Sequence, residues 1–351
     1  MGQVFLVMHP RLPRQDALKL LDSGVSRNND FKARFQREAN LLAKLSHSNI
    51  VTLYDRGQFE GRLWITMEYI NGPDAAELLK TNGPFDPDLA IPLISGAGAA
   101  LDYAWRKQRI AHRDVKPANI LLGIDEAHGV PQIESVKLSD FGIAKAAGES
   151  TSLTSTGMTI GTMQYISPEA IEGEEVDNRS DIYSLGCTAF HLLTGQPPFA
   201  GSSIAAVMSA HLTKPVPSVN SLNSDLPETM DAVFERALAK IPADRYQSCA
   251  EFVSALQEAA GGKSHYPAFA RTLTAPRPTR DGVDPNAPTK LRKAEAKAAP
   301  QSKPRMFPFV AAAAAVLVVA ASLGTYLLRP GDPDTDTTSI SSSPRTTIRL
   351  P

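Results

Sequence analysis

Three short motifs in a fixed order constrain this chain of 351 residues more than any other feature. The first occupies residues 112–119 and reads His-Arg-Asp-Val-Lys-Pro-Ala-Asn. An Asp-Phe-Gly tripeptide follows at 140–142, its aspartate 26 residues after Asp114, and a Ser-Pro-Glu tripeptide follows at 167–169. Any one of these tripeptides is expected by chance. All three in this order, with a lysine and an asparagine two and five residues after Asp114, form a highly specific pattern.

This pattern resembles the eukaryotic-like (Hanks-type) protein kinases, and the form of the first motif resembles their Ser/Thr-specific branch. The resemblance covers about residues 1–255. It implies an α+β bilobal fold, with a β-rich N-lobe at 1–69 and a helical C-lobe at 70–262. Short β-like runs at 4–8, 17–21, 50–54 and 63–69, followed by helical periodicity from about residue 74, favour the same division.

The residue types suit phosphoryl transfer from ATP. The transition state of that reaction is loose and carries its charge on the phosphoryl oxygens, so positioning and cations supply most of the catalysis. Asp140 and Asn119 provide the hard oxygen ligands that Mg²⁺ (or Mn²⁺) takes. The resemblance implies that Asp114 accepts or orients the substrate hydroxyl proton and that Lys116 reaches the transferring phosphate.

A carboxylate on an apolar helical stripe gives a second indication. The segment 31–45 predicts a helix with one apolar stripe made of Phe31, Phe35, Leu42 and Leu45. Glu38 lies on this stripe, where a carboxylate is costly unless a cation pairs with it. The candidate is Lys19, which interrupts the apolar run 17–21. In the resembled family, such a lysine contacts the α- and β-phosphates and is held by such a glutamate.

The resemblance also implies an adenine site. Met67 matches the gatekeeper position, and the segment from Glu68 to Ile70 matches the hinge that bonds adenine through its backbone. The residues expected to enclose the nucleotide are Gly2, Val4, Ala17 and Leu121.

The chain opens Met-Gly-Gln-Val, which resembles the end of a glycine-rich loop of the form G-x-G-x-x-G-x-V. We therefore expect an N-lobe without its first strand and without most of this loop, and a start codon assigned inside the gene. A second departure from the family pattern is a polar insertion at 123–134, which we interpret as a surface loop.

Several further residues are implied by the resemblance to have structural or regulatory roles. Asp181 matches the aspartate that anchors the backbone of the catalytic loop, and Glu169 is expected to pair with Arg245. Thr162 matches a structural threonine that bonds the catalytic aspartate and lysine. Autophosphorylation is expected at Thr154 and Thr156. The guanidinium of Arg113, next to Asp114, is the group that a phosphothreonine would contact.

The distribution of charge divides the chain. Residues 1–262 hold 23 Lys and Arg against 31 Asp and Glu, whereas residues 263–305 hold 10 against 3. An acidic globular domain argues against a nucleic-acid partner. The strip 263–305 contains seven prolines and few large apolar residues, so we interpret it as a disordered basic linker.

The chain has two cysteines, Cys187 and Cys249, which indicates a reducing compartment.

The segment 306–328 contains 23 residues without a charge, enough for about 34 Å of helix and so for one membrane span. Basic residues gather on its N-terminal side, including Lys303 and Arg305, whereas Arg329 alone abuts its other end. The positive-inside rule then predicts a single-pass cell-membrane protein. Its kinase domain is cytoplasmic, and the short tail 329–351 is extracytoplasmic and disordered.

The leading hypothesis is a membrane-anchored Ser/Thr protein kinase that uses ATP, phosphorylates itself and protein substrates, and forms a homodimer through the N-lobe. It most resembles the transmembrane kinases of actinobacteria. A pseudokinase or scaffold is the alternative, favoured by the incomplete glycine-rich loop. A small-molecule kinase is disfavoured because such enzymes lack the Ser-Pro-Glu segment that supports a peptide substrate.

Overall fold

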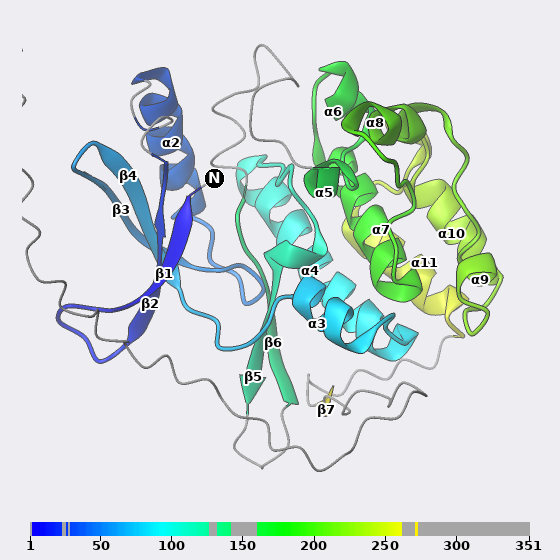
Figure 1. Cartoon of the computed structure of the whole chain (residues 1–351), viewed down its shortest axis with the longest axis horizontal. Helices are drawn as coiled ribbons and strands as arrows, with labels where there is room; N and C mark the ends of the chain where they lie inside the picture. Colours follow the sequence, from blue (N-terminus) through cyan, green and yellow to red (C-terminus); the bar gives the residue numbers. More distant parts are fainter. Residues whose placement is uncertain are drawn as a thin grey trace, which may run out of the picture. The chain divides into compact units, whose positions relative to one another are not determined.

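The apolar runs near the start of the chain form one antiparallel sheet. The computed structural model describes residues 2–22, 26, 29–125, 132–141, 160–261 and 271–272. Its first sheet has the order β1-β2-β4-β3 (Figure 1) and consists of β1 (Gln3–Met8), β2 (Gln15–Leu20), β3 (Leu53–Phe59) and β4 (Arg62–Glu68). Helix α2 (Asn29–Leu42) supplies Phe31 and Phe35 to a core shared with Leu63 and Ile65. The predicted amphipathic helix and β-rich lobe are confirmed.

The strand expected at 50–54 is displaced toward the C-terminus. Strand β3 begins at Leu53, because the residues before it pair elsewhere. Ile50 forms an isolated bridge with Leu138, and the Val51 amide donates to the Leu138 carbonyl at 3.1 Å. The segment before β3 therefore joins the sheet to the strand that leads into the Asp-Phe-Gly motif.

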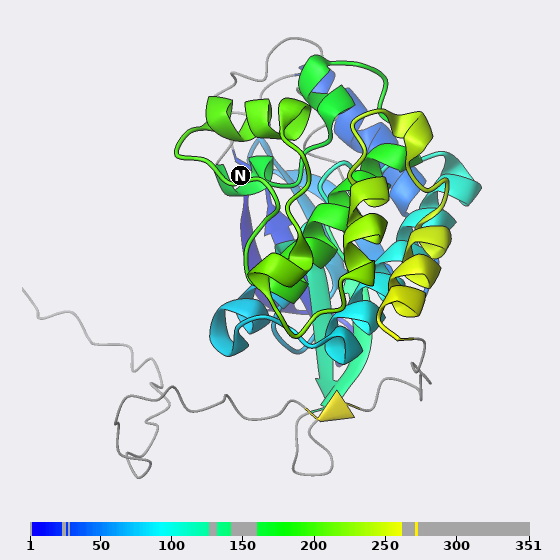
Figure 2. The ribbon, with the colours of Figure 1, turned by 90° about the vertical axis from the view of Figure 1, so that its right-hand side faces the viewer.

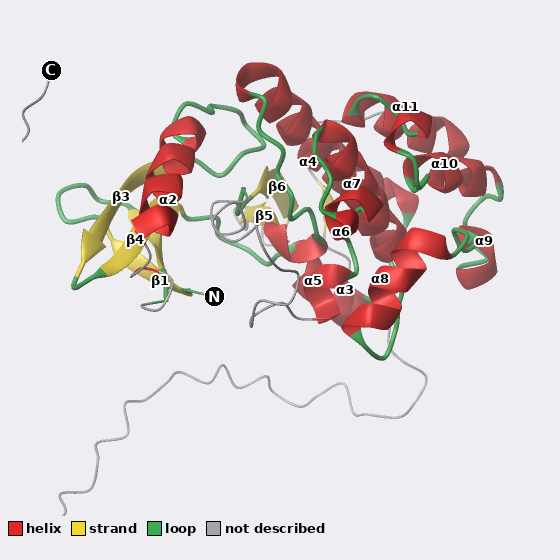
Figure 3. Ribbon diagram, turned by 90° about the horizontal axis from the view of Figure 1, so that it is seen from above, coloured by secondary structure: helices red, strands yellow, loops and turns green. Residues whose placement is uncertain are grey.

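Helices dominate the chain from residue 75 onward, which confirms the predicted helical lobe. Figure 3 shows them gathered beside the sheet-containing lobe. The helices are α3 (Ala75–Asn82), α4 (Pro87–Gln108), α5 (Ile160–Met163), α6 (Pro168–Glu172), α7 (Asn178–Thr194), α8 (Ile204–Thr213), α9 (Val219–Leu222), α10 (Thr229–Ala237) and α11 (Cys249–Ala259), with two 3₁₀ turns, η1 (Pro117–Asn119) and η2 (Pro242–Asp244).

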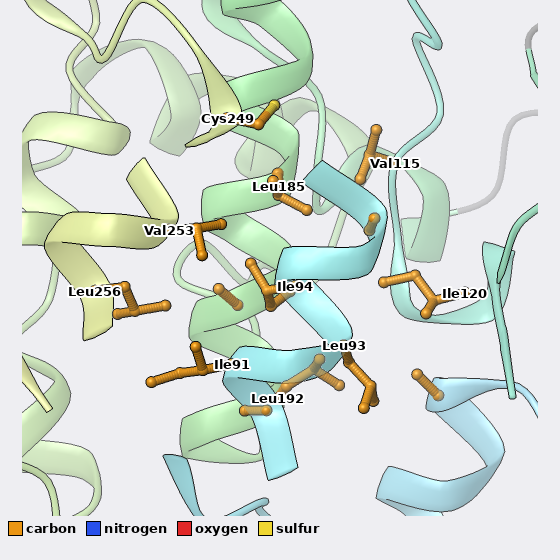
Figure 4. Close-up of a cluster of buried hydrophobic side chains, with 14 of the residues drawn as sticks. Ile91, Leu93, Ile94, Val115, Ile120, Leu185, Leu192, Cys249, Val253 and Leu256 are labelled. Atoms are coloured by element: carbon orange, nitrogen blue, oxygen red, sulfur yellow. The ribbon is translucent and has the colours of Figure 1, made fainter. Parts of the chain in front are cut away.

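The core of this lobe lies between α4, α7 and α11, which run side by side (Figures 1 and 2). Nearly every residue of α7 is buried, so this helix packs centrally in the lobe. Its N-terminus is capped by Asp177, whose side chain accepts from the Arg179 amide, and it ends at Gly195 with φ 80°. Figure 4 shows Ile94 of α4, Leu185 of α7 and Val253 of α11 meeting in this core.

A β-hairpin carries the catalytic motifs between the two lobes. Strand β5 (Ile120–Asp125) pairs antiparallel with β6 (Gln132–Leu138), and β7 (Arg271–Thr272) pairs with β6. The interpretation of 123–134 as a surface loop is wrong at both ends, where the hairpin continues. Ile133 is buried and Ile124 packs on the core, so these apolar residues extend the strands. The intervening residues 126–131 lie outside the described part.

The chain divides into two units, Met1–Arg280 and Asp281–Pro351, and every described residue belongs to the first. The predicted membrane segment 306–328, the tail 329–351 and nearly all of the linker 263–305 therefore lie outside the described residues. Within the described ranges, no helix combines the length and apolar character needed to span a bilayer.

Candidate active site

The loop before β5 is held by one buried carboxylate, as predicted. Asp181, in the first turn of α7, accepts the backbone amide of His112 at 2.6 Å and that of Arg113 at 2.8 Å. Burial raises the pKa of Asp181 to about 7, although the two backbone hydrogen bonds lower it. Two aligned donors fix the loop backbone immediately before Asp114.

His112 links the two motifs through both of its ring nitrogens. The Asp114 amide donates to Nδ1 at 3.2 Å, so Nδ1 accepts and carries no proton. Nε2 then bears the proton and donates to the Ser139 carbonyl at 2.9 Å. The imidazole also packs on the Phe141 ring, with 4.4 Å between centroids. The sequence analysis assigned no role to His112 or Phe141. Their positions inside the two motifs are the sequence signal that could have identified them.

Asp114 is oriented by its own loop. Its Oδ2 accepts from Lys116 Nζ at 2.8 Å and from Asn119 Nδ2 at 3.1 Å, and its carbonyl accepts from Asn119 Nδ2 at 2.7 Å. The structure thus brings together the three residues that the first motif predicted. A carboxylate placed between a cation and an amide is suited to receive a proton from a hydroxyl group.

Asn119 and Asp140 fit a divalent cation by their chemistry. Because Asn119 Nδ2 is committed to Asp114, the oxygen end of the amide is the end that can ligate a cation. Ser139 donates to the Asn119 carbonyl from its amide at 2.9 Å and from its hydroxyl at 3.2 Å, which ties Asn119 to the residue before Asp140. Oxygen donors of this kind are those that Mg²⁺ prefers.

Lys19 reaches across the two lobes to the second of these ligands. Its Nζ lies 2.6 Å from Asp140 Oδ1, in a pair that joins β2 to the Asp-Phe-Gly motif. Glu38, the partner expected from the helical stripe, lies half-buried on α2. The pairing of Lys19 with Glu38 stays a prediction. The contact to Asp140 places the lysine ammonium beside the expected metal ligand.

Two site residues adopt a left-handed backbone without being glycine. Arg113 has φ 65° and Asp140 has φ 59°. Such conformations cost roughly 1–3 kcal/mol each and persist where the surroundings fix them. Here Asp181 holds the amide of Arg113, and Lys19 holds the carboxylate of Asp140. These contacts account for the persistence of both strained conformations.

The residues expected around adenine lie on neighbouring strands. Ala17 is half-buried on β2 and pairs with Met67 on β4, whereas Leu121 lies on β5 next to the segment that follows the hinge. Val4 pairs with Lys19 and is 60% exposed. A Cβ on Gly2 would lie 2.2 Å from the Leu20 carbonyl oxygen, so only glycine fits this close approach.

The hinge has an ion pair that the sequence did not reveal. Glu68 pairs with Lys137 of β6 at 2.8 Å, and the same carboxylate accepts the Thr52 amide at 3.1 Å. Ile70 follows two residues later, half-buried. No local pattern signals this pair, because its two members are 69 residues apart.

The predicted pair of Glu169 and Arg245 is confirmed. The guanidinium donates to both carboxylate oxygens, at 2.8 and 2.7 Å, and both side chains are buried. Burial raises the pKa of Glu169, but the Arg245 hydrogen bonds and charge, with a further hydrogen bond from Ser180, leave it below the ordinary value. Thr162 lies half-buried on α5. Thr154 and Thr156 lie outside the described residues, so their phosphorylation stays a prediction.

Comparisons with known proteins agree with this geometry. The family model for the protein kinase domain matches residues 1–257, and the chain belongs to the protein kinase family. It is similar to serine/threonine-protein kinase PknF of Mycobacterium tuberculosis, with 46% identity over 265 residues, 75% of this chain and 54% of that protein. PknJ of the same organism is 46% identical over 264 residues, covering 75% and 44%.

Among solved structures, the kinase domain of PknI from M. tuberculosis is similar, with 36% identity and a TM-score of 0.59. That match covers 74% of this chain and 91% of the PknI domain. The chain spans about half the length of the curated relatives it matches. The resemblance to actinobacterial Ser/Thr kinases is therefore confirmed for the domain that carries the site.

Proposed function

We propose that this protein is an ATP-dependent kinase that transfers the γ-phosphoryl group to serine and threonine hydroxyls of proteins. One observation carries the proposal. Lys116 and Asn119 both donate to Asp114 within a loop fixed by Asp181, and Lys19 reaches Asp140 from the other lobe. These contacts orient the polar side chains that the resemblance assigns to the reaction.

In the proposed reaction, the substrate hydroxyl gives its proton to Asp114 as its oxygen bonds to the γ-phosphorus, and the bond to the β-phosphate breaks, releasing ADP. Lys116 lies beside Asp114 and offsets the charge of the transferring group. Lys19 contacts the α- and β-phosphates. Asn119 and Asp140 would hold Mg²⁺ or Mn²⁺, which would supply positive charge to offset that of the phosphates.

Two substitutions test the assignment. We expect Lys19→Met and Asp140→Asn each to abolish transfer of radiolabelled phosphate from ATP to a generic protein substrate, because each removes charge at the phosphates. Lys80→Met, at an exposed lysine of α3, is the matched control and should retain full activity. Normal activity of Lys19→Met, with an unchanged unfolding midpoint, would sink the kinase proposal.

A pseudokinase or scaffold, which would bind nucleotide without turning it over, is the second candidate. The two candidates differ in turnover. We expect the wild-type chain to bind ATP and to hydrolyse or transfer its γ-phosphate. Nucleotide binding in a thermal-shift assay with no turnover in the radiolabel assay would support the scaffold instead.

We propose further that the chain is anchored in the cell membrane through 306–328, with the kinase domain in the cytoplasm. The uncharged length and the flanking basic residues support this. Reporter fusions should place residue 290 inside and the C-terminus outside, and the reverse pattern would refute the charge argument. Autophosphorylation at Thr154 and Thr156 and dimerisation through the N-lobe belong to the same proposal.

A further inference from the structure

Helix α7 carries a stripe of polar side chains along one of its sides. Four of its residues recur at spacings of 4, 4 and 3, which places them on the same side of the helix: Ser180, Ser184, Thr188 and His191. The three that bear hydroxyl groups are buried, at most 6% exposed. Because a buried polar group is costly unless a partner satisfies it, the partners of this stripe indicate what it holds in place.

Two residues of the stripe hold Tyr165, which lies two residues before the Ser-Pro-Glu motif. The Ser184 hydroxyl donates to the Tyr165 carbonyl at 2.7 Å. The Tyr165 hydroxyl lies 2.7 Å from Nδ1 of His191, and the two rings stack with 6.0 Å between their centroids. Ser180 holds the motif itself through Glu169. The backbone of Tyr165, the tip of its ring and the motif that follows are thus all attached to one side of α7.

The protonation states favour a hydrogen bond from the tyrosine to the histidine. Burial lowers the pKa of His191, and a hydrogen bond with the Gly195 backbone offsets only part of this effect. Burial also raises the pKa of Tyr165. At neutral pH the imidazole is therefore neutral and offers one acceptor nitrogen, while the phenol keeps its proton. Tyr165 thus donates to Nδ1 of His191.

This hydrogen bond adds direction to contacts that have none. Tyr165 is 8% exposed and belongs to a small apolar cluster with Cys187 of α7, Phe199 and Ala210 of α8. Apolar burial is non-directional, whereas a hydrogen bond requires a defined distance and angle. The bond to His191 therefore fixes where Tyr165, and with it the backbone between α5 and α6, lies within this cluster.

We infer that His191 is a positioning residue for the protein substrate and that it acts through Tyr165. The inference rests on the proposed function, in which the segment that ends in Ser-Pro-Glu supports the peptide carrying the acceptor hydroxyl. The contacts of His191 lead to this segment and to the Gly195 turn, whereas Asp114 is held by its own loop. His191 therefore sets the affinity for the protein substrate and leaves ATP binding and the transfer step unchanged.

Removal of the acceptor nitrogen tests this role in the full chain, purified in a mild detergent. His191→Leu should raise the KM for myelin basic protein roughly fivefold, because one lost hydrogen bond lowers the fraction of the chain whose segment is in the binding position by about that factor. The KM for ATP, and kcat at saturating protein substrate, should be unchanged.

Three variants separate positioning from a general loss of packing. His191→Asn places an amide oxygen close to the position of Nδ1 and should restore most of the wild-type KM. Tyr165→Phe should raise the KM as His191→Leu does, and the two changes combined should raise it no further. Thr194→Val removes a buried hydroxyl from the same helix, where its partners are the Phe190 and Gln196 carbonyls, and should leave the KM unchanged.

Direct binding keeps the test independent of turnover. The dissociation constants for myelin basic protein, measured by thermophoresis without ATP, should follow the same order as the KM values. A wild type that binds this protein but transfers no phosphate would refute the proposed function, and the binding comparison would still decide the role of His191.

Four results would overturn the inference. They are equal affinities of wild type and His191→Leu, a raised KM for ATP in place of the protein substrate, a Thr194→Val variant as impaired as His191→Leu, and a His191→Asn variant no better than His191→Leu.

Discussion

Replacing Arg245 with methionine should destabilise the kinase domain more than the loss of any exposed ion pair. Besides the two bonds to Glu169, the guanidinium donates to the carbonyls of Ala239 at 2.8 Å, Arg179 at 2.9 Å and Lys240 at 3.1 Å. Arg245→Met leaves a buried carboxylate without its cation, which costs about 3–5 kcal/mol. For a domain of this size, that lowers the unfolding midpoint by roughly 6–20 °C.

The matched control is a more exposed pair in the same region. Arg179 and Asp177 also form a close contact, at 2.7 Å, but their side chains are 33% and 27% exposed. Arg179→Met should therefore cost under about 1 kcal/mol. Both variants would be compared by thermal and urea unfolding at neutral pH. If Arg245→Met is no less stable than Arg179→Met, then the buried pair of Glu169 and Arg245 does not hold the Ser-Pro-Glu segment in place, and the reasoning is refuted.

The same pair predicts a pH dependence. Because the pKa of Glu169 is lowered in the folded chain, its contribution is present above the ordinary value of 4.5 and is lost as the pH falls through the folded pKa. Wild type should lose this stability in acid, and Arg245→Met should lose less. Adding Glu169→Gln to Arg245→Met removes the unpaired charge, so the double variant should be more stable than the sum of the single effects predicts. Additive effects would contradict the coupling.

Three further outcomes are expected. Asp181→Asn replaces one of two acceptor oxygens facing the loop amides with a donor, so it should cost about 1–3 kcal/mol of stability and lower kcat in the phosphotransfer assay. Burial lowers the pKa of Lys240 to about 8, so the contribution of Lys240 to stability should rise with pH between about 8 and 10.5. In urea unfolding, wild type should therefore gain stability relative to Lys240→Met over this range. The double change Thr154→Ala and Thr156→Ala should lower activity markedly, and mass spectrometry that finds neither residue phosphorylated in active enzyme would contradict this.

Local patterns predicted the secondary structure and the composition of the site, but not its long-range contacts. The stripe on α2 identified Phe31 and Phe35 as core residues, because helical spacing fixes which face is buried. The same stripe led us to expect Lys19 beside Glu38, and this pairing stays a prediction. No local pattern indicated that Lys19 contacts Asp140, 121 residues away. Ile50 has strand character by composition, yet it pairs with Leu138. Such partners depend on the tertiary fold, which propensity does not encode.

Helix α7 contacts both the catalytic loop and the Ser-Pro-Glu segment through two adjacent residues, Ser180 and Asp181. Asp181 fixes the backbone before Asp114, the proposed proton acceptor, and Ser180 donates to Glu169, which Arg245 holds from the other side. The catalytic loop and the segment expected to support the substrate are thus attached to one turn of the most buried helix in the described part of the chain. Interiors are close-packed, so a shift of this turn would displace both attachments together. The relative position of proton acceptor and substrate segment is therefore set by the packing of α7.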